Sequence, residues 1–226
     1  MITINNNMYV LDTDNTSYAF AVLGSGQLEH LYYGRKLHAN EAVMTEKHTF
    51  IPGNTNVYNK DYSSYSLEDV CLEMSSLGKG DIREPFIEVT YPNGSSTTDM
   101  VFDRAEIIQG KEEYDTLPGS YDDNGEVEQL VIYLKDRNYN LTLELHYYVY
   151  EKCDIITRSA KLVNSGNESV RLERLMSMQL DLNESDYELS FFNGAWAREM
   201  NRSRIPIRAG KYVNESVTGT SSNRAN

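Results

Sequence analysis

The sequence predicts an all-β fold in which antiparallel strands form a large sandwich. Apolar residues recur at every second position over several segments, which is the period of strands and not of helices. Clusters of Gly, Asn, Asp and Pro separate these segments, and no helical segments alternate with them. The chain has 226 residues, 40% of them hydrophobic, so it is long enough to bury a substantial core. We therefore expect one large β domain.

The clearest strand is expected at residues 141–149. Its odd positions are apolar and should face the core, whereas Thr142, Glu144 and His146 should face the other side, which gives His146 a surface or cross-strand position. The same period predicts further strands at residues 18–22, 27–33, 86–91, 100–108, 129–134 and 187–192.

A hairpin is expected in the following segment. Residues 155–163 and 170–182 would form its two strands, joined by the turn Asn164-Ser165-Gly166-Asn167. One face of the second strand would carry Val170, Leu172, Met176, Met178, Leu180 and Leu182. The two methionines are then core residues and not ligands of a cofactor.

Charge and composition restrict the partners. The net charge of −13 opposes contact with phosphate backbones and anionic lipid surfaces, so we expect neither a nucleic acid nor a membrane partner, and a neutral ligand fits better. No run is apolar enough to span a bilayer, and residues 1–7 lack the features of a secretory signal, which predicts a cytoplasmic protein. Cys71 and Cys153 lie far apart, which supports neither a disulfide framework nor a zinc site.

Motif spacing alone specifies no catalytic site. The four histidines have no neighbours that define a triad, and the segments 24–26 and 78–80 lack the remaining residues of a phosphate-binding loop. The segment 122–126 (DDNGE) lacks the spacing of a calcium loop and is interpreted as an acidic surface turn. The long loop at residues 40–67 mixes aromatic, amide and charged groups, which suits either sugar binding or packing against another domain or subunit.

A resemblance to a known family extends this interpretation. Together, and in this order, several short segments look like the N-terminal domain of bacterial α-galactosidases of glycoside hydrolase family thirty-six: residues 31–35 (LYYGR), 78–85 (GKGDIREP), 117–119 (LPG), 150–159 (YEKCDIITRS), 194–199 (GAWARE) and 219–223 (GTSSN). The resemblance covers nearly the whole chain. It implies an antiparallel β-supersandwich, similar to the galactose mutarotase sandwich, over residues 1–226, with a catalytic (β/α) barrel and a C-terminal β domain expected downstream.

The resemblance also implies the chemistry. Members of the family hydrolyse terminal α-linked galactose, as in melibiose and raffinose-type sugars, with retention of configuration. The two catalytic Asp residues would lie in the barrel, beyond Asn226, so this chain should be non-catalytic by itself and need no metal or organic cofactor. Its expected partners are an α-galactoside, its own catalytic barrel, and further copies of itself in a homo-oligomer such as a tetramer.

The residues that the resemblance singles out each carry two interpretations. In tetrameric relatives a loop of this domain reaches a neighbouring active site, and the matching loop here holds Phe50, Asn54 and Tyr58, which would line the sugar pocket or brace an interface. Relatives can carry an Asp a few residues before the loop's Phe-x-Pro, whereas this chain has Lys47 and His48 before that motif. That difference argues against a carboxylate contact with galactose at this position.

Trp196, the only tryptophan, would be an aromatic wall for sugar or an interdomain anchor packed by Arg198 and Glu199. Asp81 and Arg83 would position substrate or form a bond that stabilises the turn before Pro85. A stand-alone carbohydrate-binding or adhesion domain is the main alternative for the whole chain. A mutarotase-like enzyme is a third, which needs acid and base residues converging in a cleft.

Overall fold

The computed structural model describes residues 1–38, 57–58, 60–63, 66–114, 116, 119–182, 186–195 and 197–215. These residues form two compact units, one within residues 1–181 and one within residues 182–226. Strands dominate both units, and the described helices are three short 3-10 turns, η1 (Lys60–Tyr62), η2 (Leu67–Asp69) and η3 (Glu151–Cys153). No described helix is long and apolar enough to cross a membrane.

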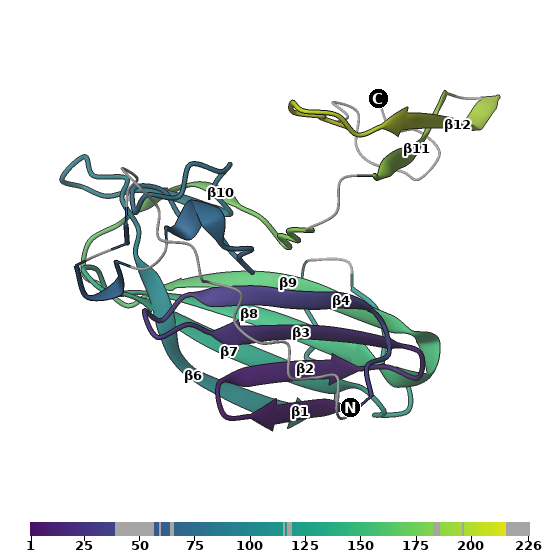
Figure 1. Ribbon diagram of the computed structural model, residues 1–226, viewed down its shortest axis with the longest axis horizontal. Coiled ribbons are helices and arrows are strands. Elements are labelled where there is room, and N and C mark those ends of the chain that lie inside the picture. Colours follow the sequence, from purple (N-terminus) through teal and green to yellow (C-terminus); the bar gives the residue numbers. More distant parts are fainter. Residues whose placement is uncertain are drawn as a thin grey trace. The chain divides into compact units, whose positions relative to one another are not determined.

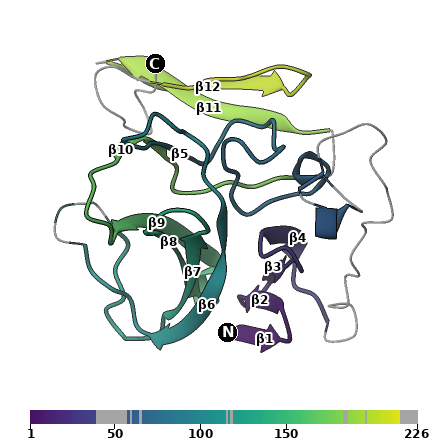
Figure 2. The same ribbon diagram turned by 90° about the vertical axis from the view of Figure 1, so that its left-hand side faces the viewer.

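The first unit is a sandwich of two four-stranded antiparallel sheets. One sheet has the order β1-β2-β3-β4 and the other β6-β7-β8-β9. Their strands run in similar directions in Figure 1, and Figure 2 shows the sheets as separate layers. The first sheet contains β1 (Ile2–Asn5), β2 (Met8–Asp12), β3 (Thr16–Val22) and β4 (Leu28–Arg35). The second contains β6 (Met100–Gln109), β7 (Glu128–Asp136), β8 (Leu141–Tyr150) and β9 (Ile155–Asn164).

Apolar side chains at every second position of the strands form the core between these sheets. The odd positions 141–149 of β8 are all buried in one cluster with Leu130, Ile132 and Leu134 of β7, as the sequence predicted. Three aromatic rings connect the two sheets. Phe20 of β3 stacks on Tyr9 of β2 with 5.0 Å between ring centres and on Tyr147 of β8 with 5.2 Å. The fold is thus the antiparallel β-sandwich that the sequence indicated.

All seven strands expected singly from the sequence are present, but the expected hairpin is wrong. Strand β10 (Arg171–Leu175) does not fold back on β9; it pairs with β5 (Ile87–Thr90) in a separate two-stranded sheet. Because β10 has only five residues and a bulge after Leu172, the alternation does not hold one apolar face over residues 170–182. Leu172, Met178 and Leu182 are exposed, while Val170, Met176 and Leu180 pack partly against the core.

On the outer face of β8, His146 takes the cross-strand position that the sequence offered and not the surface position. It is only 4% exposed. Its Nδ1 lies 2.9 Å from Nε2 of Gln129 on β7, and its Nε2 lies 3.2 Å from Glu144 Oε2. The connection between β6 and β7 covers this face, where the Tyr114 hydroxyl lies 2.5 Å from the Tyr148 hydroxyl. An outward-pointing side chain is buried here because a loop packs over it.

The second unit contains one described hairpin of β11 (Glu188–Ala195) and β12 (Arg198–Pro206), paired antiparallel. Leu189 and Phe191 alternate with exposed neighbours along β11, so one face is half-buried. The sequence predicted β11 but not β12 or the first two strands, β1 and β2.

Candidate functional site

Most residues singled out for sugar contact lie outside the described part of the chain. Phe50, Asn54 and Trp196 fall on residues whose structure is not described, so their contact with sugar stays a prediction. Tyr58 is described and is 6% exposed. Its hydroxyl donates to both carboxylate oxygens of Asp99, at 2.8 and 3.1 Å.

The surroundings of Tyr58 hold it firmly in place. It belongs to a small buried apolar cluster with Leu23, Leu67, Val70 and Leu72. Burial raises the pKa of the Tyr58 hydroxyl; a hydrogen bond with Gln27 opposes this and the bond to Asp99 reinforces it. Lys79 Nζ lies 3.4 Å from Asp99 and 5.1 Å from the centre of the Tyr58 ring. Within the described residues Tyr58 therefore anchors the end of the 40–67 loop to the sandwich.

Asp81 and Arg83 form the bond that the sequence suggested. Arg83 Nε donates to Asp81 Oδ1 at 2.9 Å, and the Arg83 backbone N–H donates to the same oxygen at 3.1 Å. The guanidinium also donates to the carbonyls of Val70 and Leu67, at 2.7 Å each, and pairs with Asp181. The planar guanidinium thus joins three segments of the first unit, at residues 67–70, 81–83 and 181.

Arg198 and Glu199 lie at the turn of the β11–β12 hairpin in the second unit, and both are exposed. Glu199 Oε1 accepts the backbone N–H of Ala197 at 2.9 Å, and the Arg198 carbonyl accepts a bond from the Asn201 side chain at 2.9 Å. Ala197 and Met200 both have positive φ, at 60° and 58°. These bonds stabilise the strained backbone at the start of β12.

A cluster of buried polar residues that the sequence analysis did not predict lies inside the sandwich. We call it the Glu73 cluster; its members are Glu73, Tyr18, His30, Tyr147 and Arg158, from β3, β4, β8, β9 and the segment after η2. Tyr18 Oη donates to Glu73 at 2.6 Å and Tyr147 Oη donates at 2.7 Å. His30 Nδ1 lies 2.8 Å from Glu73, and Arg158 Nη2 lies 3.2 Å from it.

The electrostatics of this cluster keep its carboxylate charged. Burial would raise the pKa of Glu73, but Arg158, His30 and Tyr18 together hold it below its ordinary value. Burial raises the pKa values of Tyr18 and Tyr147 well above the usual range, so both remain hydrogen-bond donors. Glu73 has no solvent-exposed surface, and Arg158 also donates to the Gln179 carbonyl at 2.8 Å. Acid and base groups do converge here, but protein encloses them, so the cluster stabilises the fold.

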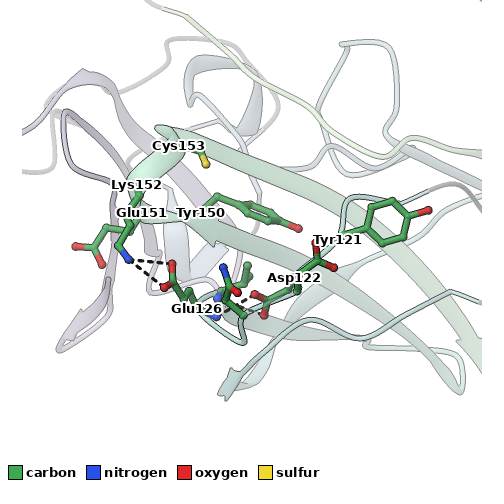
Figure 3. Close-up of a pocket in the computed structure, with 10 residues that line it drawn as sticks. Tyr121, Asp122, Glu126, Tyr150, Glu151, Lys152 and Cys153 are labelled. Carbon is green, nitrogen blue, oxygen red and sulfur yellow. Dashed lines mark hydrogen bonds and ion pairs between the residues drawn. The ribbon is translucent and has the colours of Figure 1, made fainter.

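An open cavity of about 490 Å³ lies between the β6–β7 connection and η3. We call it the Tyr121 cavity; it is lined by Tyr121, Asp122, Asp123, Asn124, Glu126, Val127, Tyr150, Glu151, Lys152 and Cys153. Figure 3 shows the ion pair of Lys152 with Glu126 on one side and the Tyr121 ring on the other. The sequence indicated only an acidic turn, because spacing along one segment does not reveal that residues 150–153 face it.

Carboxylates border this cavity, but they do not form a metal centre. Among the residues that the structure describes, no three His, Cys, Asp or Glu side chains gather closely enough to hold a metal ion. The described sites therefore offer hydrogen-bonding groups and aromatic surface to a ligand.

Comparison with known proteins places the chain in a family. The model of the glycosyl hydrolase family 36 N-terminal domain matches residues 26–226. The chain belongs to this family. It is 34% identical over 222 residues to the α-galactosidase AgaA of Geobacillus stearothermophilus, covering 96% of this chain and 30% of that protein.

Solved structures agree with this assignment. The family 36 α-galactosidase AgaB of the same organism superposes with a TM-score of 0.92 at 30% identity, covering 100% of this chain and 31% of that one. A variant of AgaA in complex with raffinose superposes with a TM-score of 0.86 at 32% identity, covering 97% and 30%. This family 36 N-terminal domain thus spans about 30% of the length of these relatives. The match confirms the family and the fold that the resemblance implied.

Proposed function

We propose that the chain is the non-catalytic N-terminal domain of a retaining α-galactosidase that removes terminal α-linked galactose from melibiose and raffinose-type sugars. The observation that carries this proposal is the extent of the match. It covers 96% of this chain but only 30% of AgaA, and a variant of AgaA has been solved with raffinose. The remaining length of such a protein would contain the catalytic barrel and a C-terminal β domain.

The chemistry of the described residues supports a non-catalytic role. Retaining hydrolysis needs two carboxyl groups about 5 Å apart on either side of a bound sugar. Glu73, which accepts hydrogen bonds from two tyrosine hydroxyls, is enclosed by Tyr18, Tyr147 and Arg158 and cannot meet a substrate. We therefore assign hydrolysis to the barrel of the full-length enzyme.

We assign to this domain two supporting roles, oligomer assembly and shaping of the active site. The 40–67 loop and Trp196 carry the aromatic and amide groups that suit sugar, and Tyr58 fixes the end of that loop to the sandwich through Asp99. In the full-length enzyme, Phe50→Ala, Asn54→Ala and Trp196→Ala should each raise KM for raffinose. Unchanged KM and kcat in all three variants would remove these residues from the sugar pocket.

We also propose a cytoplasmic location and a homo-oligomer, a tetramer being one form. Cys71 and Cys153, the only cysteines of the chain, form no disulfide, which suits a reducing compartment. Deletion of residues 1–226 from the full-length enzyme should lower the number of subunits per particle, as measured by sedimentation, and impair turnover. A deleted enzyme with full activity and an unchanged number of subunits would contradict both supporting roles.

A further inference from the structure

We propose that the Tyr121 cavity is an oligosaccharide-binding site that takes a neutral sugar with at least two pyranose rings. The site is built entirely from this chain, from the β6–β7 connection and η3 at one end of the second sheet. Its ligand class follows from the groups that line it, and the inference goes beyond the α-galactosidase function proposed above.

Size and shape favour an extended ligand. Small-molecule sites in proteins usually have volumes of roughly 300–1,000 Å³. At about 490 Å³ the Tyr121 cavity falls within this range. A second cavity of about 210 Å³, which contains Tyr114 and Ser120, shares the side chains of Tyr121 and Asp122 with it. Tyr121 thus stands between two hollows, and a chain of sugars laid across its ring would extend into both.

Tyr121 has the exposure that a sugar platform needs. It is 81% exposed, so its ring is available to the apolar face of a pyranose. Tyr150 lines the same cavity, and its hydroxyl lies 2.6 Å from Ser120 Oγ, which ties the loop that carries Tyr121 to the end of β8. The cavity therefore offers two aromatic rings: the exposed ring of Tyr121, and the ring of Tyr150, whose hydroxyl is held by a hydrogen bond.

The polar groups of the cavity match sugar hydroxyls. Asp122 accepts the backbone N–H groups of Glu126 at 2.9 Å and Val127 at 3.3 Å, and Lys152 donates to both oxygens of Glu126 at 3.0 Å. These bonds fix the side chains but leave acceptor positions on the carboxylates and donors on the ammonium group. Within the described chain, the side chains of Asp123, Asn124 and Glu151 make no hydrogen bond and remain available to a ligand.

The part of the cavity lining that η3 supplies is anchored to the sandwich. Asp154, at the end of η3, adopts a left-handed conformation with φ of 55°. Its carboxylate accepts bonds from Thr13 Oγ1 at 2.8 Å and from the Asn15 backbone and side chain at 2.8 and 2.7 Å. This anchors η3 to the β2–β3 turn, so binding need not order η3, which favours affinity.

The charges argue against other ligand classes. Four carboxylates, from Asp122, Asp123, Glu126 and Glu151, repel an anion, and Lys152 is the one cation among the residues lining the cavity. Among the described residues, no three carboxylate, His or Cys side chains gather closely enough to hold a metal ion. A neutral ligand rich in hydroxyls fits both observations.

Calorimetric titration of the 226-residue chain with raffinose tests the proposal. We expect saturable binding of raffinose and at least about tenfold weaker binding of free galactose, because a monosaccharide fills one side of Tyr121 only. Tyr121→Ala should weaken raffinose binding about tenfold through the lost ring contact, whereas Tyr121→Phe should retain it. Tyr33→Ala is the matched control, since Tyr33 is an exposed tyrosine at 51% on β4 outside the cavity.

Three results would overturn the proposal. The first is a lack of saturable binding of raffinose and of maltotriose, a chain of three pyranoses. The second is equal raffinose affinity in the Tyr121→Ala variant and the unmodified chain. The third is saturable binding of Ca²⁺ alone that is lost in Asp123→Asn, because this would make the cavity a cation site. Far-ultraviolet circular dichroism of each variant separates loss of binding from loss of fold.

Discussion

Arg158 and Glu73 form an ion pair inside the sandwich, with 3.2 Å between Nη2 of the arginine and Oε2 of the carboxylate. Both side chains are almost completely buried, and neighbouring tyrosine hydroxyls occupy the remaining bonding positions of the carboxylate. A buried pair of this kind stabilises a fold only while it is complete, because the loss of one partner leaves an uncompensated charge in a low-dielectric interior.

Removal of this charge should therefore be strongly destabilising. We expect Glu73→Gln to lower the free energy of unfolding by about 3–5 kcal/mol, because Arg158 would remain buried without its counter-ion. Denaturant unfolding at neutral pH measures the change. The control is Glu173→Gln, which removes the exposed partner of Arg171 and should cost less than about 1 kcal/mol. Equal costs in the two variants would contradict the structural role of the Glu73 cluster.

His146 should make stability depend on pH in the weakly acidic range. Burial holds the pKa of His146 below its ordinary value of 6.5, although Glu144 opposes this shift. As the pH falls below 6.5, the unfolded chain takes up the proton before the folded chain does, so the free energy of unfolding falls. The contribution is present above pH 6.5 and is lost as the pH drops through the folded-state value.

The measurement is a series of denaturant unfolding curves between neutral pH and the onset of carboxylate titration. His146→Gln should reduce the slope of stability against pH in this range. The same slope in His146→Gln as in the unmodified chain would show that another group titrates.

Arg83 should stabilise the fold through the planar geometry of its guanidinium group and not through its charge alone. Lysine cannot reproduce the simultaneous bonds to Asp81, Leu67 and Val70, so Arg83→Lys should cost about 2–3 kcal/mol of stability. Arg104→Lys, at an exposed pair on β6, should cost less than about 1 kcal/mol. Turnover of the full-length enzyme should persist in Asp81→Asn with Arg83→Lys; a fall in kcat of the folded protein would instead give these residues a place near the substrate.

Substitution of two glycines with positive φ allows the energetic cost of backbone strain to be measured apart from the cost of a steric clash. Gly78 has φ of 96°, and a Cβ there would lie 2.5 Å from Thr97 Oγ1 and 3.0 Å from Thr97 Cβ. Gly94 has φ of 81° with nothing within 4 Å. Gly94→Ala should cost about 1–2 kcal/mol, from strain alone. Gly78→Ala should cost about 1–3 kcal/mol more, from overpacking, and equal costs in thermal unfolding would show that Thr97 moves freely.

The alternation of apolar and polar residues along single segments was sufficient to predict the strands that contribute most to the core. In β8 and β7 the alternation of side chains predicted burial, because both strands have one face on the core along their whole length. The pairing of β10 was not predictable in this way. Its partner β5 lies about 80 residues earlier in the chain, and periodicity carries no information about such long-range pairing.

The candidate sites, like the strand pairing, were predictable only where their residues are close together in the sequence. The Asp81–Arg83 bond joins residues two positions apart, so the sequence already suggested it. The Glu73 cluster gathers side chains from β3, β4, β8, β9 and the segment after η2, and each of them taken alone is an ordinary strand or loop residue. The Tyr121 cavity likewise forms only where the β6–β7 connection meets η3. Such sites depend on tertiary contacts that no single segment encodes.

We propose that this chain supports a hydrolysis that another part of the full-length protein performs. The deciding experiment compares hydrolysis of a chromogenic α-galactoside by the 226-residue chain and by the same protein extended through its native downstream sequence, at matched molar concentrations. We expect activity in the extended protein only. Activity in the short chain would contradict it by revealing a catalytic site within residues 1–226, and activity in neither protein would contradict the assignment to an α-galactosidase.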